Sequence, residues 1–252
     1  MTTAAESFRP GLFDGHHVMV SGGTSGIGLA IARGFAALGA TVLATGSSED
    51  KIAGLRREGG IAGLTFRSLD VRDRAAVQAV VGGLDALDVL VNAAGIARPH
   101  REFEEDTFLE VMDVNLNAAM RLAMAARPLL ARRGGSILNF ASMLSYVADA
   151  AVPAYGASKT GILGLTRHLA HAFGPEGIRV NAISPGYHRT DMTRELWEDP
   201  GAAAKIEAKT AVRRWGTTED LVGTALFLAS PAAAYVTGAD LPVDGGYVVS
   251  GF

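Results

Sequence analysis

The sequence predicts an α/β protein built on a doubly wound parallel sheet of about seven strands, with helices on both faces, in a single domain spanning 1–252. Short apolar runs of strand length alternate with segments of helical periodicity, and the links between them are short. Glycine-rich, proline-containing or small-residue turns follow several of the apolar runs. In a sheet of this kind ligands bind at the carboxyl ends of the strands, so chemistry is expected there.

The individual elements follow from the same patterns. Apolar runs bounded by turn residues predict strands at 17–20, 41–45, 62–68, 87–91, 136–141, 178–184 and 239–243. Helical patterns are found near 29–38, 49–58, 74–83, 104–127, 154–173 and 218–229. We expect residues 1–14 to form a loose arm and the least regular segment, 187–216, to form a lid over a substrate.

The composition excludes several classes of protein. A hydrophobic content of 48% with 19% charged residues provides a core, and a net charge of -3 gives no reason to expect nucleic acid or an anionic membrane as a partner. The absence of cysteine excludes thiolate chemistry and thiolate metal sites, and we expect no metal. The first residues lack a signal-peptide core, and no apolar run approaches ~18 residues. A cytoplasmic protein is the expectation.

A glycine-rich turn follows the first predicted strand. Gly22, Gly26 and Gly28 are spaced G-x-x-x-G-x-G and open the first helical segment. A turn in this place directs backbone N–H groups and the positive end of a helix at a phosphate. The pattern favours a bound dinucleotide over a merely tight turn between strand and helix.

The end of the second strand governs the choice of dinucleotide. An acidic residue there holds the ribose hydroxyls of NAD, and a basic one holds the 2′-phosphate of NADP. Gly46, Ser47 and Ser48 supply neither charge, which gives a slight preference for NAD. After the third strand, Asp70 is a candidate either for accepting a hydrogen bond from adenine or for capping the helix that starts near Asp73.

Three side chains near residue 150 have the chemistry to move a proton on and off an alcohol oxygen. Tyr155 and Lys159 are four residues apart in a predicted helix, so they share a face, and an ammonium beside a phenol is expected to lower the phenol's pKa. Ser142 follows the apolar run of the fifth strand. Asn115, a weak helix former at the middle of a long helical pattern, indicates a kink or a bound water.

These motifs resemble the short-chain dehydrogenase/reductase family, whose members have a Rossmann-type fold, over essentially the whole chain. The resemblance rests on the glycine turn, on Asp70, on the Asn92-Ala93-Ala-Gly95 turn, on Asn115 and Ser142, on Tyr155-Gly-Ala-Ser-Lys159 and on Pro185-Gly186-Tyr-His-Arg-Thr190.

The resemblance assigns roles to these positions. It implies that Tyr155 is the acid/base, that Ser142 hydrogen-bonds the reacting oxygen, that Lys159 lowers the Tyr155 pKa and holds the nicotinamide ribose, and that Asn115 positions a water. Ile27 and Ile183 are expected to flank the cofactor. The implied cofactor-binding residues are Gly22, Thr24, Ser25, Gly26, Ile27, Gly28, Ser47, Asp70, Val71, Asn92, Ala93, Gly95, Tyr155, Lys159, Pro185, Gly186 and Thr190.

Within the family the chain looks most like the sugar-acid and polyol dehydrogenases, of the gluconate and 2-keto-3-deoxy-gluconate types. The expected substrate-facing residues are Ser142, Leu144, Tyr155, Tyr187 and His188. A sugar acid would need a cation, for which the candidates are Arg98, His100, His188, Arg189 and Arg194. Ala151 stands where relatives acting on keto-sugar acids can carry Arg, so a neutral polyol or sugar stays open.

Two other functions are compatible with the sequence: an NADPH-dependent 3-oxoacyl-(acyl-carrier-protein) reductase, and a dinucleotide-sensing protein that has lost activity. The resemblance also implies a homotetramer paired through the helices 104–127 and 154–173. The faces expected to pair carry Ala118, Ala119, Ala123, Leu165 and Leu169. The apolar tail ending at Phe252 is expected to close a neighbouring subunit's site.

Overall fold

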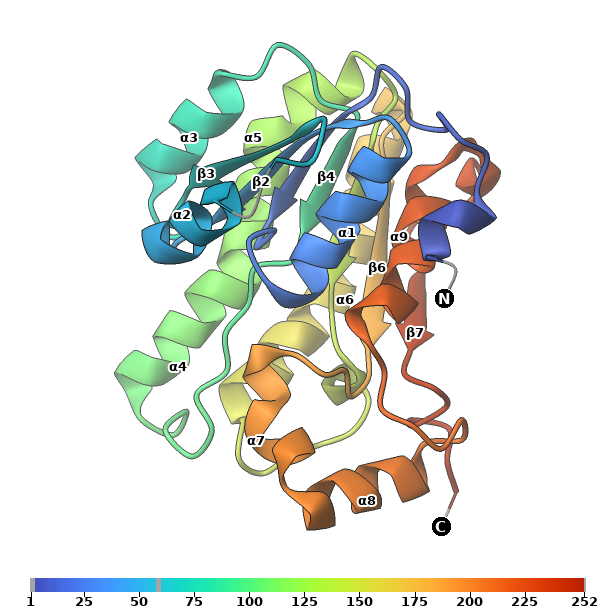
Figure 1. Cartoon of the computed structure of the whole chain (residues 1–252). Coiled ribbons are helices and arrows are strands. Elements are labelled where there is room, and N and C mark those ends of the chain that lie inside the picture. Colours follow the sequence, from blue (N-terminus) through green and yellow to red (C-terminus); the bar gives the residue numbers. More distant parts are fainter. Residues whose placement is uncertain (1–2, 58–59, 252) are drawn as a thin grey trace.

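The computed structural model of the chain describes residues 3–57 and 60–251. Its seven strands form one parallel sheet in the order β3-β2-β1-β4-β5-β6-β7 (Figure 1). The strands are β1 (His17–Ser21), β2 (Thr41–Gly46), β3 (Leu64–Ser68), β4 (Val89–Asn92), β5 (Ser136–Phe140), β6 (Arg179–Pro185) and β7 (Asp240–Val243). The predicted Rossmann-type fold is confirmed. The strand order reverses between β1 and β4, which opens a crevice at their carboxyl ends.

Helices cover both faces of the sheet because its strands are apolar on both sides. One face carries α1 (Gly26–Ala37) and α9 (Val222–Ala229), and the other carries α3 (Arg74–Gly82), α5 (Ala118–Ala131) and α6 (Pro153–Phe173) (Figure 1). Successive side chains of β1 alternate between the two layers: Val18 and Val20 pack toward α1, and Met19 packs toward α3 and α5. A further helix, α2 (Glu49–Arg57), packs against β3.

The long helix predicted at 104–127 is interrupted. It consists of α4 (Glu105–Met112), a π-helical turn over Asp113–Asn117, and α5. Within the turn the backbone N–H of Ala118 bonds to the carbonyl of Asp113, five residues back. Asn115 lies in this turn, so the irregularity falls where its poor helix propensity predicts one.

Residues 3–14 do not form the loose arm expected from the sequence. Phe13 is 1% exposed and packs edge-on against Phe35 of α1, with ring centroids 4.9 Å apart. The N–H of Ala4 also donates to the carboxylate of Glu219 at 2.7 Å. The expectation was wrong because burial of Phe13 outweighs the disorder that the segment's composition suggests.

The segment 187–216 is more regular than its sequence suggests. It contains α7 (Arg194–Glu198) and α8 (Pro200–Lys209), which lie beyond the carboxyl ends of the strands (Figure 1). Asp199 caps α8 by accepting from the N–H of Ala202 at 2.7 Å, and Pro200 occupies its first position. That this segment acts as a lid stays a prediction.

The helix faces expected to pair subunits are not the ones left open. Ala118, Ala119, Ala123 and Leu169 are all buried in the chain's own core, and Leu165 packs against it. These positions are covered because they face the sheet. The exposed apolar side chains of α4 and α5 are instead Leu109, Met120 and Met124.

The tail folds back on its own chain. Asp244 accepts from the backbone N–H of Gly246 and of Val248, and the Tyr247 ring lies 5.3 Å from that of Tyr187 and 4.5 Å from Lys209 Nζ. Phe252 lies outside the described residues. In the part of the chain that is described, helices long and apolar enough to cross a membrane are absent.

Candidate active site

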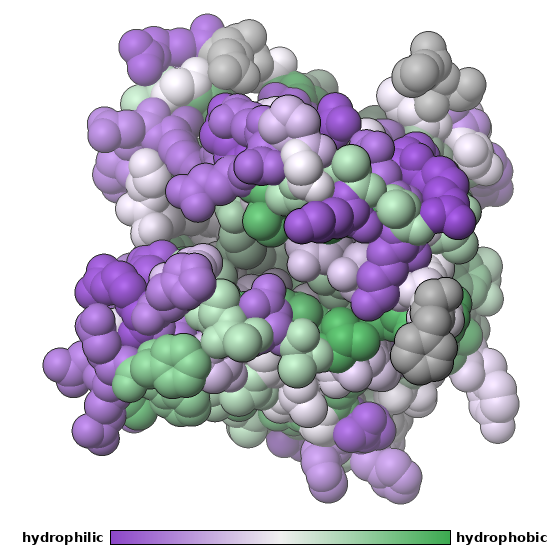
Figure 2. Space-filling model, turned by 90° about the horizontal axis from the view of Figure 1, so that it is seen from below, coloured by the Kyte–Doolittle hydropathy of each residue, from purple (hydrophilic) through white to green (hydrophobic). Residues whose placement is uncertain are grey.

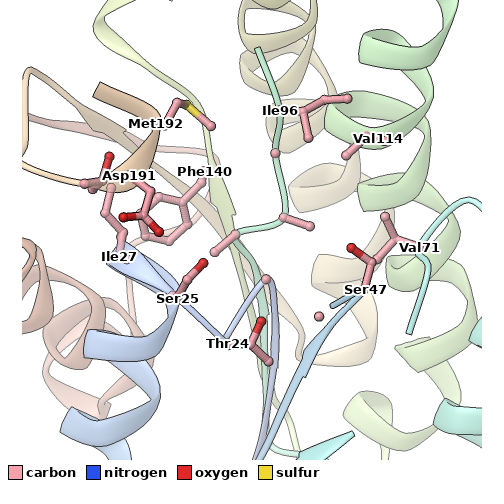
Figure 3. Close-up of a pocket in the computed structure, with 18 of the residues that line it drawn as sticks. Thr24, Ser25, Ile27, Ser47, Val71, Ile96, Val114, Phe140, Asp191 and Met192 are labelled. Atoms are coloured by element: carbon pink, nitrogen blue, oxygen red, sulfur yellow. The ribbon is translucent and has the colours of Figure 1, made fainter. Parts of the chain in front are cut away.

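A cleft of about 440 Å³ lies at the carboxyl ends of the strands, at the β1/β4 reversal. Figure 2 looks onto this end of the molecule and shows its surface hollowed near the centre. Of the residues that the sequence assigns to the cofactor, all but Asn92 and Ile183 line the cleft. In Figure 3, Ser47 and Val71 lie on one side of the cleft, and Ile27, Asp191 and Met192 lie on the other.

The floor of the cleft is main chain in close contact. Gly22 has φ +76°, and a Cβ there would lie 2.5 Å from the backbone nitrogen of Ala94. A Cβ on Gly28 would lie 2.2 Å from the carbonyl oxygen of Gly22. Only glycine fits these positions, and α1 begins directly above this floor with its N–H groups toward the cleft. The cradle fits the pyrophosphate of a dinucleotide.

The end of β2 differs from the reading of its sequence. A Cβ on Gly46 would lie 2.1 Å from Thr24 Oγ1, so the packing of Thr24 fills the place where an acidic side chain would start. Ser47, Ser48 and Lys51 line the cleft here. The expectation that no cation is present is therefore wrong. Lys51 escapes prediction from the strand pattern because it lies on α2, beyond the end of β2.

Lys51 also connects the two walls. Its Nζ lies 3.3 Å from Oδ2 of Asp191, which belongs to the segment on the opposite side of the cleft (Figure 3). Both side chains are half-exposed or more, at 50% and 62%. The ion pair therefore spans the opening of the cleft.

Asp70 lines the cleft but does not cap a helix. Asp73 is the cap of α3, accepting from the N–H groups of Ala75 and Ala76. Asp70 pairs instead with Arg72 at 2.8 Å, and the hydrogen bond from that guanidinium lowers the pKa of the Asp70 carboxyl. Arg72, itself a lining residue that the sequence reading missed, continues this charged wall toward Glu110 at 3.6 Å.

Ser142, Tyr155 and Lys159 meet at the other end of the cleft. Ser142 follows β5 and caps a short 3-10 turn by accepting from the N–H of Leu144 at 3.1 Å. Tyr155 and Lys159 lie on α6, and Lys159 Nζ donates to the carbonyl of Phe140 at 2.7 Å. The same Nζ lies 5.6 Å from the centroid of the Tyr155 ring.

The pKa of Tyr155 departs from expectation. Burial raises the pKa of the phenol, and the hydrogen bond with Ser142 lowers it less than burial raises it. Burial also lowers the pKa of Lys159 to about 8. The expected lowering of the tyrosine's pKa by Lys159 is thus wrong for this structure, because desolvation of the phenolate dominates. The arrangement favours a protonated phenol, the form that can donate to a ketone oxygen.

Asn115 lies behind the cleft and holds its wall. Its Oδ1 accepts from the N–H of Ile96 at 2.8 Å, and its Nδ2 donates to the carbonyl of Ile96 and to Ser158 Oγ at 2.9 and 3.1 Å. A Cβ on Gly95 would lie 3.4 Å from Lys159 Nζ and 3.5 Å from Asn115 Oδ1. The water assigned to Asn115 stays a prediction.

Several predicted residues point elsewhere. Asn92 is buried and donates to Asn139 at 2.9 Å, and Ile183 is fully buried in the core, so neither borders the cleft. Leu144 lies outside the lining. Tyr187 packs edge-on against Trp215, with ring centroids 5.5 Å apart, and against the tail. Strand patterns predict which residues lie at or near the end of a strand, but not whether each side chain faces the cleft or the core.

His188 does line the cleft, with its ring largely enclosed. It is 3% exposed and lies under Gly216, where a Cβ would approach the ring Cδ2 to 2.4 Å. Its Nδ1 is 3.1 Å from the carbonyl of Gly186. Burial lowers the pKa of His188, which favours the neutral imidazole.

Known proteins resemble this chain over almost its full length. A family model described as enoyl-(acyl carrier protein) reductase matches residues 22–248. The chain is 38% identical to a 2-dehydro-3-deoxy-D-gluconate 5-dehydrogenase of Bacillus subtilis, over 93% of this chain and 95% of that protein. It is 39% identical to a galactitol 2-dehydrogenase of Cereibacter sphaeroides, over 94% of this chain and 96% of that protein.

A solved structure extends the likeness to three dimensions. The gluconate 5-dehydrogenase from Burkholderia cenocepacia, in complex with NADP and tartrate, superposes with a TM-score of 0.87 at 34% identity, covering 95% of this chain and 97% of that one. Fold, site and relatives agree. The chain belongs to the short-chain dehydrogenase/reductase family of NAD(P)-dependent oxidoreductases acting on CH–OH groups.

Proposed function

We propose that the protein interconverts a secondary alcohol and a ketone on a small sugar acid or polyol, using NADP in preference to NAD. The observation that carries the proposal is the single cleft, which joins Ser142, Tyr155 and Lys159 at one end to Ser47 and Lys51 at the other. The relatives' activities on gluconates and galactitol support the substrate class.

The preference for NADP rests on charge at the end of β2. The NAD preference expected from the sequence is not supported: relatives such as the Burkholderia enzyme bind NADP, and Lys51 supplies the cation that seemed to be missing. Two serine hydroxyls beside it are suitable donors to a phosphate. Because Gly46 leaves no room for an acidic side chain, nothing at that position repels a 2′-phosphate.

The roles of the catalytic side chains follow from their chemistry. The nicotinamide, when bound, supplies or accepts the hydride. Tyr155 gives its phenolic proton to the ketone oxygen in reduction and takes the alcohol proton in oxidation, while the Ser142 hydroxyl hydrogen-bonds the same oxygen. Lys159, anchored on the carbonyl of Phe140, holds the nicotinamide ribose.

Arg98 is the best candidate to bind a substrate carboxylate. Of the five cationic candidates, Arg98 and His188 line the cleft, and burial lowers the pKa of His188, which disfavours its charged form. The guanidinium of Arg98 lies 3.4 Å from Glu110, which holds it at the wall of the cleft. Its replacement by Gln should raise KM for an aldonic acid and leave KM for a neutral polyol unchanged.

The proposal is tested by titrating the protein with NADPH and NADH by fluorescence, then assaying polyols, aldonic acids, keto acids and acetoacetyl-CoA with the tighter dinucleotide. We expect NADPH to bind more tightly and a sugar acid or polyol to turn over. Turnover confined to acetoacetyl-CoA would favour the 3-oxoacyl reductase. Tight binding without turnover of any compound would favour a dinucleotide sensor.

We also infer a cytoplasmic homotetramer. Leu109, Met120 and Met124 are 56%, 39% and 44% exposed on α4 and α5, and exposed apolar side chains that form a patch are candidates for an interface between subunits. Light scattering at micromolar concentration tests the assembly, and a monomer contradicts it.

A further inference from the structure

We propose that Glu102 is a positioning residue for Tyr155, holding the first turn of α6 to the loop that follows β4. The proposal rests on the role of Tyr155 given above. Glu102 is 1% exposed, and its two carboxylate oxygens accept from two backbone N–H groups, those of Arg98 and Tyr155, both at 2.8 Å. A carboxylate this deeply buried is rare unless each oxygen is satisfied, as here.

The hydrogen bond to Tyr155 replaces a helix cap. The first N–H groups of a helix have no partner within it, and Val152, at the cap position of α6, provides no side-chain hydrogen bond. The acceptor comes instead from 53 residues earlier in the chain. A local cap would make no contact with the loop 96–104, whereas Glu102 lies on that loop and binds the first turn of α6 directly.

The other backbone group of Tyr155 is tied to the same loop. Its carbonyl accepts from Ser158 Oγ at 2.7 Å, and Ser158 Oγ in turn accepts from Asn115. Asn115 also accepts from the N–H of Ile96, at the start of the loop. A third hydrogen bond joins the loop to the segment just before α6, where the N–H of His100 donates to the carbonyl of Ala151 at 2.8 Å. Glu102 and Asn115 thus hold the two ends of the loop, and both connect to the main chain of the catalytic tyrosine.

Glu102 also acts on Tyr155 through its charge. Burial is the main cause of the raised pKa of Tyr155, and the negative charge of Glu102 raises it further. The titratable and charged side chains on the elements packed here are Lys159, Arg167, His168 and His171 on α6, Asp149 before α6, Arg98, His100, Arg101 and Glu104 on the loop, and Glu105, Asp106 and Glu110 on α4. Removing the Glu102 charge should therefore lower the Tyr155 pKa, while removing the exposed charge of Glu105 should not.

The test compares E102Q and E102D with the matched control E105Q. A glutamine has one acceptor oxygen, so in E102Q the amide NH₂ must face one of the two backbone N–H groups. We expect a loss of about 10- to 100-fold in kcat, the size of effect caused by a displaced catalytic group, with the Kd for NADPH unchanged. The pH limb that reports Tyr155 should move to lower pH in E102Q. E102D, which keeps the charge on a shorter stem, should lose kcat without that move.

A role limited to stability predicts a different pattern. If E102Q lowers the melting temperature but keeps the kcat and pH profile of the wild type, the proposal is wrong. If E102Q does not fold, the proposal is wrong if E102D keeps the kcat of the wild type. If the wild type turns over no alcohol, the Tyr155 pKa can still be measured by ultraviolet titration, as the difference between a protein that has Tyr155 and the corresponding Y155F variant. A Tyr155 pKa that is the same in E102Q as in the wild type would show that the charge of Glu102 has no effect on it.

Discussion

Replacement of Lys51 by alanine should selectively weaken the use of NADPH. A phosphate monoester carries about -1.5 to -2 charges at pH 7, and two unit charges 4 Å apart attract by about 1 kcal/mol in water and about 4 kcal/mol at an effective dielectric constant of 20. Lys51 is 50% exposed, so the lower part of this range applies. To bind the phosphate, Lys51 must break its ion pair with Asp191, which costs up to about 1 kcal/mol because exposed ion pairs are weak.

The net contribution of Lys51 is then about 1–2 kcal/mol, or roughly 5- to 30-fold in affinity. We expect K51A to lower kcat/KM for NADPH by this factor and to leave kcat/KM for NADH unchanged. The difference between wild type and variant should shrink at high salt, because half-exposed charges are screened. Initial rates with both dinucleotides at two ionic strengths measure all of this, and K205A, on the exposed side of α8, controls for loss of charge. An equal loss with NADH and NADPH, or none with either, would refute the reasoning.

Three further predictions concern stability. K159M should abolish activity yet raise the free energy of unfolding at pH 7 by up to about 3 kcal/mol, because burial lowers the Lys159 pKa from 10.5 to about 8. This destabilisation of the wild type is complete below pH 8 and disappears as the pH rises toward 10.5. Free energies of unfolding of wild type and K159M that fail to converge between pH 8 and 10.5 would contradict it. G22A should destabilise the protein by roughly 2 kcal/mol or more, because φ is +76° and the added Cβ collides with backbone. G54A, on α2 with open space around it, should stabilise the protein by up to about 1 kcal/mol, so the urea midpoints of the two variants should shift in opposite directions. F13A should cost about 3–5 kcal/mol if the N-terminal segment is part of the core, and a midpoint near that of the wild type would restore the loose arm.

Much of the fold could be predicted because strand and helix periodicity are local. The apolar run that becomes β1 and the glycine spacing after it fixed the first βα unit, and Asn115 marked the irregular turn between α4 and α5. Phe13 could not be placed, because the segment before β1 has too few apolar residues to show a helix or strand period.

The site was predictable at its ends and not along its walls. Tyr155 and Lys159 share a helix face, so spacing alone brings them together. Lys51, Arg72 and Glu102 matter through contacts with distant segments, such as the 53-residue separation between Glu102 and Tyr155, and these contacts exist only once the loops are packed. The direction of the Tyr155 pKa was missed for the same reason, since burial is not a local property of sequence.

The glycine floor of the cleft has a consequence for how this protein can diverge. Where Gly22 and Gly28 bring main chain against main chain, there are no side chains to exchange, and any added atom collides with backbone. Point mutations can therefore alter what the two ends of the cleft recognise, through residues such as Lys51 and Arg98, but they have nothing to alter between those ends. New specificities can arise here by changing either end separately, while the middle of the binding site is inherited unchanged.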